Sequence, residues 1–223
     1  LITGPAGSGK STTLSCIIDR INSERNCHIM TFEDPIEFIH KHKKSIVSQR
    51  EISTDSKSYI SSLRSSLRQA PDVMLIGEMR DLDTIEIALT AAETGHLVLS
   101  TLHTTGAANT IDRIIDVFPS NQQQQVRIQL SMQLQAVISQ QLIASPVCGQ
   151  VPAFEVMLVN NAVSNLIRES KVHQLNSVIH SSEGMGMKSM DTSILELYNE
   201  GLITKEKALL HSIDPDSIIK QFS

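Results

Sequence analysis

A glycine-rich segment near the start of the 223-residue sequence carries the pattern of a phosphate-binding loop. Residues 4–11 read GPAGSGKS and match G-x-x-x-x-G-K-[ST] without a gap. Glycines let such a backbone wrap closely around phosphate oxygens and direct its N–H groups at them. In this pattern the lysine reaches the β- and γ-phosphates and the serine hydroxyl ligates Mg²⁺. The sequence therefore predicts binding of ATP with Mg²⁺, and the expected contact residues are Gly4, Pro5, Ala6, Gly7, Ser8, Gly9, Lys10, Ser11 and Thr12.

An acidic residue later in the chain is placed to support hydrolysis as well as binding. Hydrolysis needs a carboxylate near the γ-phosphate that positions or deprotonates a water molecule. Glu78 follows the apolar run 73–76, which is typical of a strand buried on both faces. Because α/β sheets bind ligands at the carboxyl ends of their strands, we predict that Glu78 activates the water. The alternative is an ordinary acid after a strand.

A second group of acids follows the strand predicted at residues 28–32. Glu33, Asp34 and Glu37 repel one another unless a cation lies among them, and Mg²⁺ bound to ATP is the expected cation. Glu33 is thus a further candidate metal ligand beside Ser11. In the alternative reading, Asp34 only shapes a turn before the proline that follows it.

Two histidines and several arginines complete the candidate groups. His103 follows a strand that ends near Ser100, where an imidazole could sense the γ-phosphate or steady the attacking water. An ordinary hydrogen-bonded histidine is the alternative. His96 precedes the same strand and is expected at its other end. Arginines that neutralise transition-state charge come from the same chain or a neighbour, and those available are Arg64, Arg68, Arg80 and Arg113.

Strands and helices alternate in the first half of the sequence. Apolar residues at helical spacing predict helices over 14–21, 60–67, 85–92 and 108–118, and apolar runs predict strands over 28–32, 73–76 and 97–99. This alternation predicts an α/β fold with a mainly parallel sheet that is covered by helices on both faces.

The character of the sequence changes near Pro119. We expect a core over residues 1–118 and a remainder over 119–223. The remainder is predicted to contain a hairpin at about 139–158, with strands over 140–145 and 151–158, and then a smaller, mainly helical C-terminal subdomain from Asn161. Because only three residues precede the phosphate loop and the sequence does not begin with Met, we expect a fragment that lacks an N-terminal domain and most of its first strand.

The composition of the chain argues against several classes of protein. A net charge of −5, a pI near 5.9 and 3% aromatic residues argue against a protein that mainly binds nucleic acid. The three widely spaced cysteines form no CxxC pair, which predicts reduced thiols in a cytoplasm and no zinc site or other structural metal. No apolar stretch is long enough to cross a bilayer, so we expect a protein peripheral to any membrane it serves.

Four segments together resemble the ATPases of the type II and type IV secretion superfamily. GPAGSGKST, TFEDPIEF, LIGEMRDLDTI and TGHLVLSTLHTTGAANTIDRIIDVFP are similar in order and spacing to its Walker A, Asp box, Walker B and His box. The resemblance runs from Leu1 to about Ser145 and continues more loosely beyond. It implies a RecA-like core, a homo-hexamer, and catalytic roles for Glu33 and His103 beside Glu78, with His96 in support.

Within this superfamily the sequence most resembles the branch that retracts type IV pili. It lacks the four-cysteine segment found in pilus-extension and type II secretion motors, and NLIRESKV at 165–172 is similar to a motif of the retraction branch. The tail from Gly184 is also similar to that branch. The motif's opening Ile-Arg is replaced here by Val163-Ser164, so one positive charge is absent, and this departure suggests an accessory retraction paralogue as an alternative.

The resemblance implies a cytoplasmic hexameric ATPase at the inner face of a bacterial inner membrane. It would act on an inner-membrane platform protein, withdraw pilin subunits and so drive twitching motility. The alternatives are a motor of a related secretion or adhesion system, an accessory retraction paralogue, and a subunit that binds ATP only to hold its hexamer together. A nucleic-acid translocase is disfavoured by the acidic composition.

Overall fold

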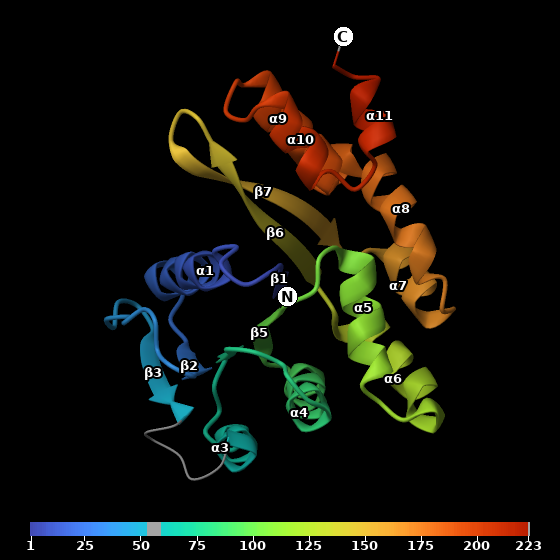
Figure 1. Cartoon of the computed structure of the whole chain (residues 1–223). Coiled ribbons are helices and arrows are strands. Elements are labelled where there is room, and N and C mark those ends of the chain that lie inside the picture. The colour runs from blue at the N-terminus through green and yellow to red at the C-terminus, as the bar shows by residue number, and fades with distance from the viewer. Residues whose placement is uncertain (53–58, 223) are drawn as a thin grey trace. The chain divides into compact units, whose positions relative to one another are not determined.

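The computed structural model of the chain describes residues 1–52 and 59–222 (Figure 1). The chain divides into two compact units. The first unit comprises residues 1–2, 10–102 and 114–133, and the second comprises residues 3–9, 103–113 and 134–223. Two elements contain residues of both units, β1 (Ile2–Thr3) and α5 (Ala107–Asp116).

The first unit contains a parallel sheet with the strand order β3-β2-β4-β5. These strands are β2 (His28–Glu33), β3 (Ile46–Glu51), β4 (Val73–Ile76) and β5 (Leu97–Leu102). Phe32 pairs with Ile76, and Ile76 pairs with Ser100, so these three strands reach their carboxyl ends at the same edge. The predicted parallel α/β arrangement is confirmed, whereas the strand β3 was not predicted from the sequence.

Helices of the first unit surround this sheet. They are α1 (Lys10–Glu24), α3 (Tyr59–Ser66), α4 (Leu82–Glu93) and α6 (Ser120–Gln133). Helix α4 packs against α3 and α6 and starts with a capping box, in which the Asp81 carboxylate accepts from the Thr84 N–H. The chain then turns at Gly95, whose φ of +96° favours glycine.

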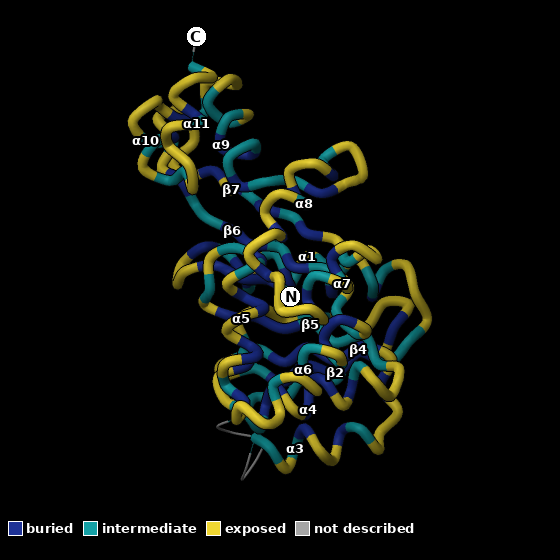
Figure 2. The backbone as a smooth tube through the Cα atoms, turned by 90° about the vertical axis from the view of Figure 1, so that its right-hand side faces the viewer, coloured by how far each residue is buried: buried dark blue, intermediate teal, exposed yellow. Residues whose placement is uncertain are grey.

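The core of the first unit lies along its central strands. All four residues of β4 are buried, as expected for an apolar strand with neighbours on both sides and helices on its faces (Figure 2). Phe32 of β2 and Ile18 of α1 are also fully buried. Glu33 and Gly77 therefore lie at the ends of strands that are rigidly held in a closely packed core.

The second unit is built on a long antiparallel hairpin. Its strands are β6 (Ala136–Ser145) and β7 (Gly149–Leu158), paired in register from Ala136 with Leu158 to Ser145 with Gly149. The strands predicted over 140–145 and 151–158 are confirmed, and both extend farther than their apolar runs indicated. Figure 1 shows α9 and α10 beside this hairpin, and both helices contact it.

The segment after the hairpin is helical, as predicted. It contains α7 (Asn161–Arg168), α8 (Leu175–Ser181), α9 (Met190–Asn199), α10 (Lys205–His211) and α11 (Pro215–Ile219), with short 3-10 turns at Val172–Gln174 and Glu183–Met185. Four of these helices follow a side chain that caps their first turn, namely Asn160, Ser189, Thr204 and Asp214.

Apolar side chains join the last helices to the hairpin within the second unit. The buried cluster contains Ile143, Val151, Ala153, Met190, Ile194, Ile203, Ala208 and Ile218. Hairpin and C-terminal helices therefore share one hydrophobic core. Among the residues that the structure describes, none of the helices combines the length and apolar character needed to cross a membrane.

Candidate nucleotide-binding site

The glycine-rich loop of the second unit lies against strand β6. Gly4 has a φ of +141°, and a Cβ built on it would lie 2.2 Å from the backbone oxygen of Gln140. A Cβ on Gly9, whose φ is +85°, would lie 2.8 Å from Nε2 of the same glutamine. Both positions thus require glycine for their backbone angle and for the close approach of Gln140. The sequence motif explains the glycines but did not identify Gln140.

The loop also contains a buried polar atom that suits an anionic ligand. The Ser8 hydroxyl is buried and has no hydrogen-bond partner among the described residues, while its backbone N–H donates to the Pro5 oxygen at 3.2 Å. Buried hydroxyls without partners are rare because each costs free energy. A phosphate oxygen would accept from this hydroxyl, so the loop fits the predicted ligand.

Helix α1 of the first unit begins directly after the loop, at Lys10. The Lys10 side chain is 8% exposed, and its burial lowers the pKa of the ammonium group, although the nearby carboxylates of Glu78 and Glu37 act in the opposite direction. The structure thus brings Lys10 and Glu78 into one electrostatic environment. Ser11 and Thr12 follow in the first turn of this 15-residue helix, whose positive end favours anions.

Glu78 follows Gly77, whose backbone is hydrogen-bonded to both neighbouring strands at the carboxyl edge of the sheet. The Gly77 N–H donates to the Phe32 oxygen of β2 at 2.8 Å, and the Thr101 hydroxyl of β5 donates to the Gly77 oxygen at 2.6 Å. The Glu78 carboxylate itself accepts from Nε of Arg80 at 2.8 Å. This hydrogen bond raises the pKa of the Arg80 guanidinium. The predicted base and one predicted supporting arginine are therefore in contact.

Glu33 lies at the same edge as Glu78. It ends β2 beside Gly77, where a Cβ built on that glycine would lie 3.4 Å from the Glu33 Cα. Its carboxylate accepts from the Thr31 hydroxyl at 2.7 Å and from Nε2 of Gln49 at 3.4 Å. Two proposed site carboxylates thus lie at the carboxyl ends of adjacent strands, where the sequence pattern predicts them.

A bound Mg²⁺ would depend on oxygen atoms of the nucleotide. In the described part of the chain, His, Cys, Asp and Glu side chains form no group of three that could hold a metal ion. Mg²⁺ in phosphate-binding sites commonly takes only one or two protein ligands and completes its shell with phosphates and water. Ser11 and Glu33 remain the residues predicted to supply those ligands.

His96 lies at the other end of the sheet from Glu78. It precedes Leu97, which pairs with Val73 at the start of β4. Its Nδ1 lies 2.9 Å from the Ala91 oxygen and 3.0 Å from the Thr94 hydroxyl, at the carboxyl end of α4. These contacts explain His96 as a residue that stabilises a helix end, and they separate it from the acidic edge.

His103 belongs to the second unit and begins the segment that leads into α5. Its side chain is exposed, and the segment is attached to the hairpin by bonds from Gly106 to Ser139 and from Ala107 to Glu155. Arg113 is exposed on α5. Ser139 and Glu155 were not predicted from the sequence.

The sequence nevertheless holds a signal for Glu155. Along β7 the residues at every second position from Val151 to Met157 are buried, and Glu155 occupies one of these positions between Ala153 and Met157. An acid within the buried face of a strand pattern needs a specific partner. Such an acid can be identified from its apolar neighbours, whereas its partner cannot.

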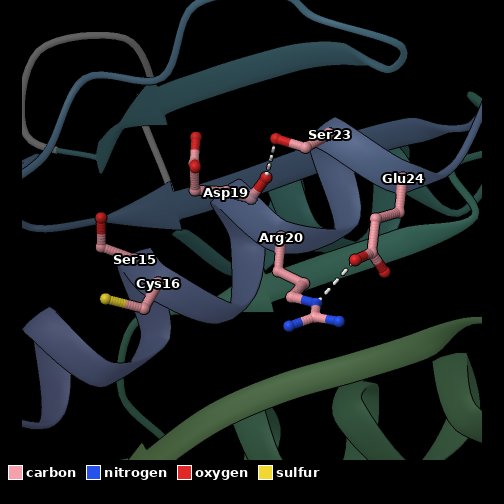
Figure 3. Close-up of a pocket in the computed structure, with 6 residues that line it drawn as sticks. All are labelled: Ser15, Cys16, Asp19, Arg20, Ser23 and Glu24. Atoms are coloured by element: carbon pink, nitrogen blue, oxygen red, sulfur yellow. Dashed lines mark hydrogen bonds and ion pairs between the residues drawn. The ribbon is translucent and has the colours of Figure 1, made fainter.

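A separate shallow hollow lies on the exposed face of α1, as Figure 3 shows. Its polar groups already have partners. Arg20 pairs with Glu24 at 2.7 Å, the Ser23 hydroxyl donates to the Asp19 backbone oxygen at 2.8 Å, and Lys43 outside the hollow binds the Asp19 carboxylate. None of the predicted site residues lines this hollow, which is formed by Ser15, Cys16, Asp19, Arg20, Ser23 and Glu24.

Two curated relatives are similar to almost all of the chain. The "Twitching motility protein" of Neisseria gonorrhoeae is 52% identical over 98% of this chain and 59% of the relative. The "Type IV pilus retractation ATPase PilT" of Pseudomonas aeruginosa is 53% identical over 93% of this chain and 60% of the relative. The chain thus spans about three-fifths of the length of these relatives.

Solved structures show the same fold. A crystal structure of the pilus retraction motor PilT with bound ADP superposes with a TM-score of 0.92 at 52% identity, covering 98% of this chain and 62% of that one. The ATPase DotB of Legionella pneumophila gives a TM-score of 0.85 at 30% identity over 94% of this chain and 58% of that one. A family model described as "Type II/IV secretion system protein" matches residues 1–206. The chain therefore belongs to the type II/IV secretion system protein family, as the four sequence motifs indicate.

Proposed function

We propose that the chain is the ATP-hydrolysing core of a motor that retracts type IV pili. The observation that carries the proposal is the place of Glu78, which follows β4 at the sheet edge and shares an electrostatic environment with Lys10, the lysine of the phosphate loop. An ATPase needs both groups, one for the phosphates and one for the water. The similarity to a solved retraction motor with bound ADP supports the same nucleotide chemistry.

The proposed nucleotide contacts begin with the loop and the helix that follows it. Backbone N–H groups of the loop, which Pro5 lacks, bind the phosphates, Lys10 neutralises their charge, and Ser11 and Thr12 lie at the positive end of α1. Mg²⁺, when bound with ATP, supplies charge that stabilises the leaving phosphate oxygens. Ser11 is the proposed metal ligand, with Glu33 as a further one.

The proposed hydrolysis step uses the acidic edge. Glu78 orients the water and accepts its proton, while Arg80 keeps the carboxylate in place through its 2.8 Å hydrogen bond. Glu33 and His103 support the site, and Arg113 is a further candidate for contact with phosphate. The resemblance to secretion ATPases also suggests a supporting role in hydrolysis for His96, but the hydrogen bonds of His96 at the end of α4 favour a structural role.

The proposed cargo follows from the names of the relatives. Both curated relatives above concern twitching motility or pilus retraction, and their identities of 52% and 53% exceed the 42% found for the pilus ATPase PilU of Pseudomonas aeruginosa. We therefore propose a homo-hexamer at the cytoplasmic face of an inner membrane that acts on a pilus platform protein. A motor of a related secretion system is the second candidate, supported by the family model described as "Type II/IV secretion system protein".

Steady-state ATP hydrolysis by the purified protein tests the enzymatic part. Glu78→Gln is expected to lower kcat by about 100-fold or more because it removes the proposed base. Lys10→Ala is expected to weaken nucleotide binding. Glu86→Gln removes an exposed carboxylate on α4 and serves as the matched control. Equal turnover in the wild type and in Glu78→Gln would refute the role of Glu78, and stimulation by DNA would favour a translocase.

A second experiment tests the cargo. Replacement of the matching segment of PilT by this chain, which covers 60% of that relative, is expected to preserve twitching motility in Pseudomonas aeruginosa, whereas the same replacement with Glu78→Gln is not. An active ATPase that fails to restore twitching would favour the related secretion motor or the accessory paralogue. A folded wild-type hexamer without turnover would favour a subunit that binds ATP for assembly only.

A further inference from the structure

Two buried polar side chains face the same side of the hairpin in the second unit. Ser139 of β6 pairs directly with Glu155 of β7. Residues directly opposite each other in an antiparallel pair share one face of the sheet. Ser139 is 0% exposed and Glu155 is 3% exposed. Polar groups buried this completely are costly unless they are hydrogen-bonded, so their partners show what they do.

Both side chains accept hydrogen bonds from the segment that carries His103. The Gly106 N–H donates to the Ser139 hydroxyl at 2.9 Å, and the Ala107 N–H donates to Oε1 of Glu155 at 2.7 Å. Ala107 is the first residue of α5, where backbone N–H groups lack partners within the helix. The two bonds therefore fix the end of a segment that starts only three residues earlier, at His103.

The Glu155 carboxylate is bound at the start of a second helix as well. It accepts a backbone hydrogen bond from Met190, the first residue of α9. Positive helix ends favour a carboxylate. Burial is nonetheless the larger effect and raises the pKa of Glu155, and the charge of Asp191 acts in the same direction. Glu155 thus joins the beginning of α5 to the beginning of α9.

We propose that Ser139 and Glu155 are positioning residues that hold the segment 103–107 against the hairpin and so place His103 for ATP hydrolysis. The proposal rests on the proposed function, because the role of His103 in hydrolysis is itself proposed. Neither side chain needs to touch the nucleotide. Their effect comes from geometry, since a displacement of about 1 Å in a catalytic group can cost about 100-fold in rate.

The second unit offers a matched pair of serines for a test. Ser139→Ala removes a buried hydroxyl that accepts one backbone N–H from the His103 segment. Ser193→Ala removes another buried hydroxyl, which accepts the Phe154 N–H at 3.0 Å and does not contact that segment. Glu155→Ala removes the second anchor, and if this variant fails to fold, the two serine variants decide the question.

The first measurement is hydrogen–deuterium exchange of the purified protein without nucleotide, followed in peptides that cover residues 103–107. We expect exchange about 10-fold faster in Ser139→Ala and Glu155→Ala, because each loses a bond that protects the segment. Ser193→Ala is expected to match the wild type there. Exchange in Ser139→Ala equal to that of the wild type would overturn the proposal, whether or not the protein hydrolyses ATP.

The second measurement is the separate determination of kcat and KM for ATP. A misplaced His103 lowers kcat, so Ser139→Ala is expected to lose about 10-fold in kcat with KM changed by less than about 3-fold. Ser193→Ala is expected to keep both values. An equal loss of kcat in both serine variants, or none in Ser139→Ala, overturns the positioning role. A wild type without turnover refutes the proposed function and, with it, the role of the segment in hydrolysis.

Discussion

Nε of Arg80 lies 2.8 Å from Oε2 of Glu78, so the proposed base is held by a cation two residues away in the same loop. The arginine side chain is 65% exposed and the glutamate side chain 25% exposed. Ion pairs this accessible to water contribute at most about 1 kcal/mol to stability. The contact therefore serves mainly to orient the carboxylate.

Substitution of Arg80 tests this orientation. We expect Arg80→Ala to lower kcat for ATP by about 10-fold, a smaller loss than in Glu78→Gln, because the carboxylate remains but is less well oriented. The free energy of unfolding in urea is expected to change by less than about 1 kcal/mol. Arg20→Ala breaks the exposed pair with Glu24 on α1 and is the matched control. A rise in kcat in Arg80→Ala would mean that the ion pair restrains the base instead.

The two histidines are expected to respond in opposite ways. His96→Ala removes hydrogen bonds at the end of α4, so it should lower the free energy of unfolding by about 1 kcal/mol and leave kcat within about 2-fold. His103→Ala removes an exposed side chain and should lower kcat by about 10-fold or more with little change in stability. Urea unfolding and ATP turnover measured on both variants check this. Loss of turnover in His96→Ala at unchanged stability would contradict the assignment of a structural role to His96 and a catalytic role to His103.

Gly4 offers a test of the contact between the loop and β6. In Gly4→Ala the new Cβ would lie 2.2 Å from the Gln140 oxygen, and a backbone atom cannot move away without displacing the strand. We expect a loss of about 3 kcal/mol or more in the free energy of unfolding, from this overlap together with the unfavourable φ. The measurement is urea unfolding without nucleotide.

Gly149 in the hairpin turn is the control for Gly4. Its φ of +82° is similarly unfavourable for alanine, but apart from its two chain neighbours no described residue has an atom within 4 Å of the built Cβ. The free energy of unfolding of Gly149→Ala is therefore expected to fall by only about 1 kcal/mol, which is the cost of the unfavourable backbone angle alone. Equal losses at the two positions would show that the close approach of Gln140 does not matter.

The parallel core could be predicted because its signals are local. Val73–Ile76 is apolar throughout and coincides with the strand β4, and Glu78 follows it at the sheet edge. The edge strand β3 was missed because its sequence IVSQRE is mostly polar and only Val47 is buried in it. A strand with one neighbour and one open edge does not need a continuous apolar run.

The anchors of the His103 segment could not be predicted because their partners are distant in sequence. Ser139 lies 33 residues from Gly106, and Glu155 lies 48 residues from Ala107. No periodicity or motif specifies which backbone N–H meets a buried side chain, since that depends on how the hairpin packs. The phosphate loop is different, because its glycines and lysine form one continuous pattern.

The buried carboxyl of Glu155 predicts a pH dependence of stability. Its pKa is raised above the ordinary value of 4.5, so the folded protein keeps this proton at pH values where the unfolded chain has released it. The folded state then binds more protons, and the favourable contribution present below about pH 4.5 is lost as the pH rises through the raised pKa. Glu155→Gln cannot titrate at this position.

The unfolding free energy of the wild type minus that of Glu155→Gln should therefore fall as the pH is raised from about 4 to 7, because only the wild type loses the contribution of this proton. Urea unfolding at several pH values measures it. Ser139→Ala removes the neighbouring anchor without a titrating group, so its difference from the wild type is expected to stay constant. A difference that rises with pH for Glu155→Gln would mean that the bonds from Ala107 and Met190 outweigh burial and hold the carboxylate ionised.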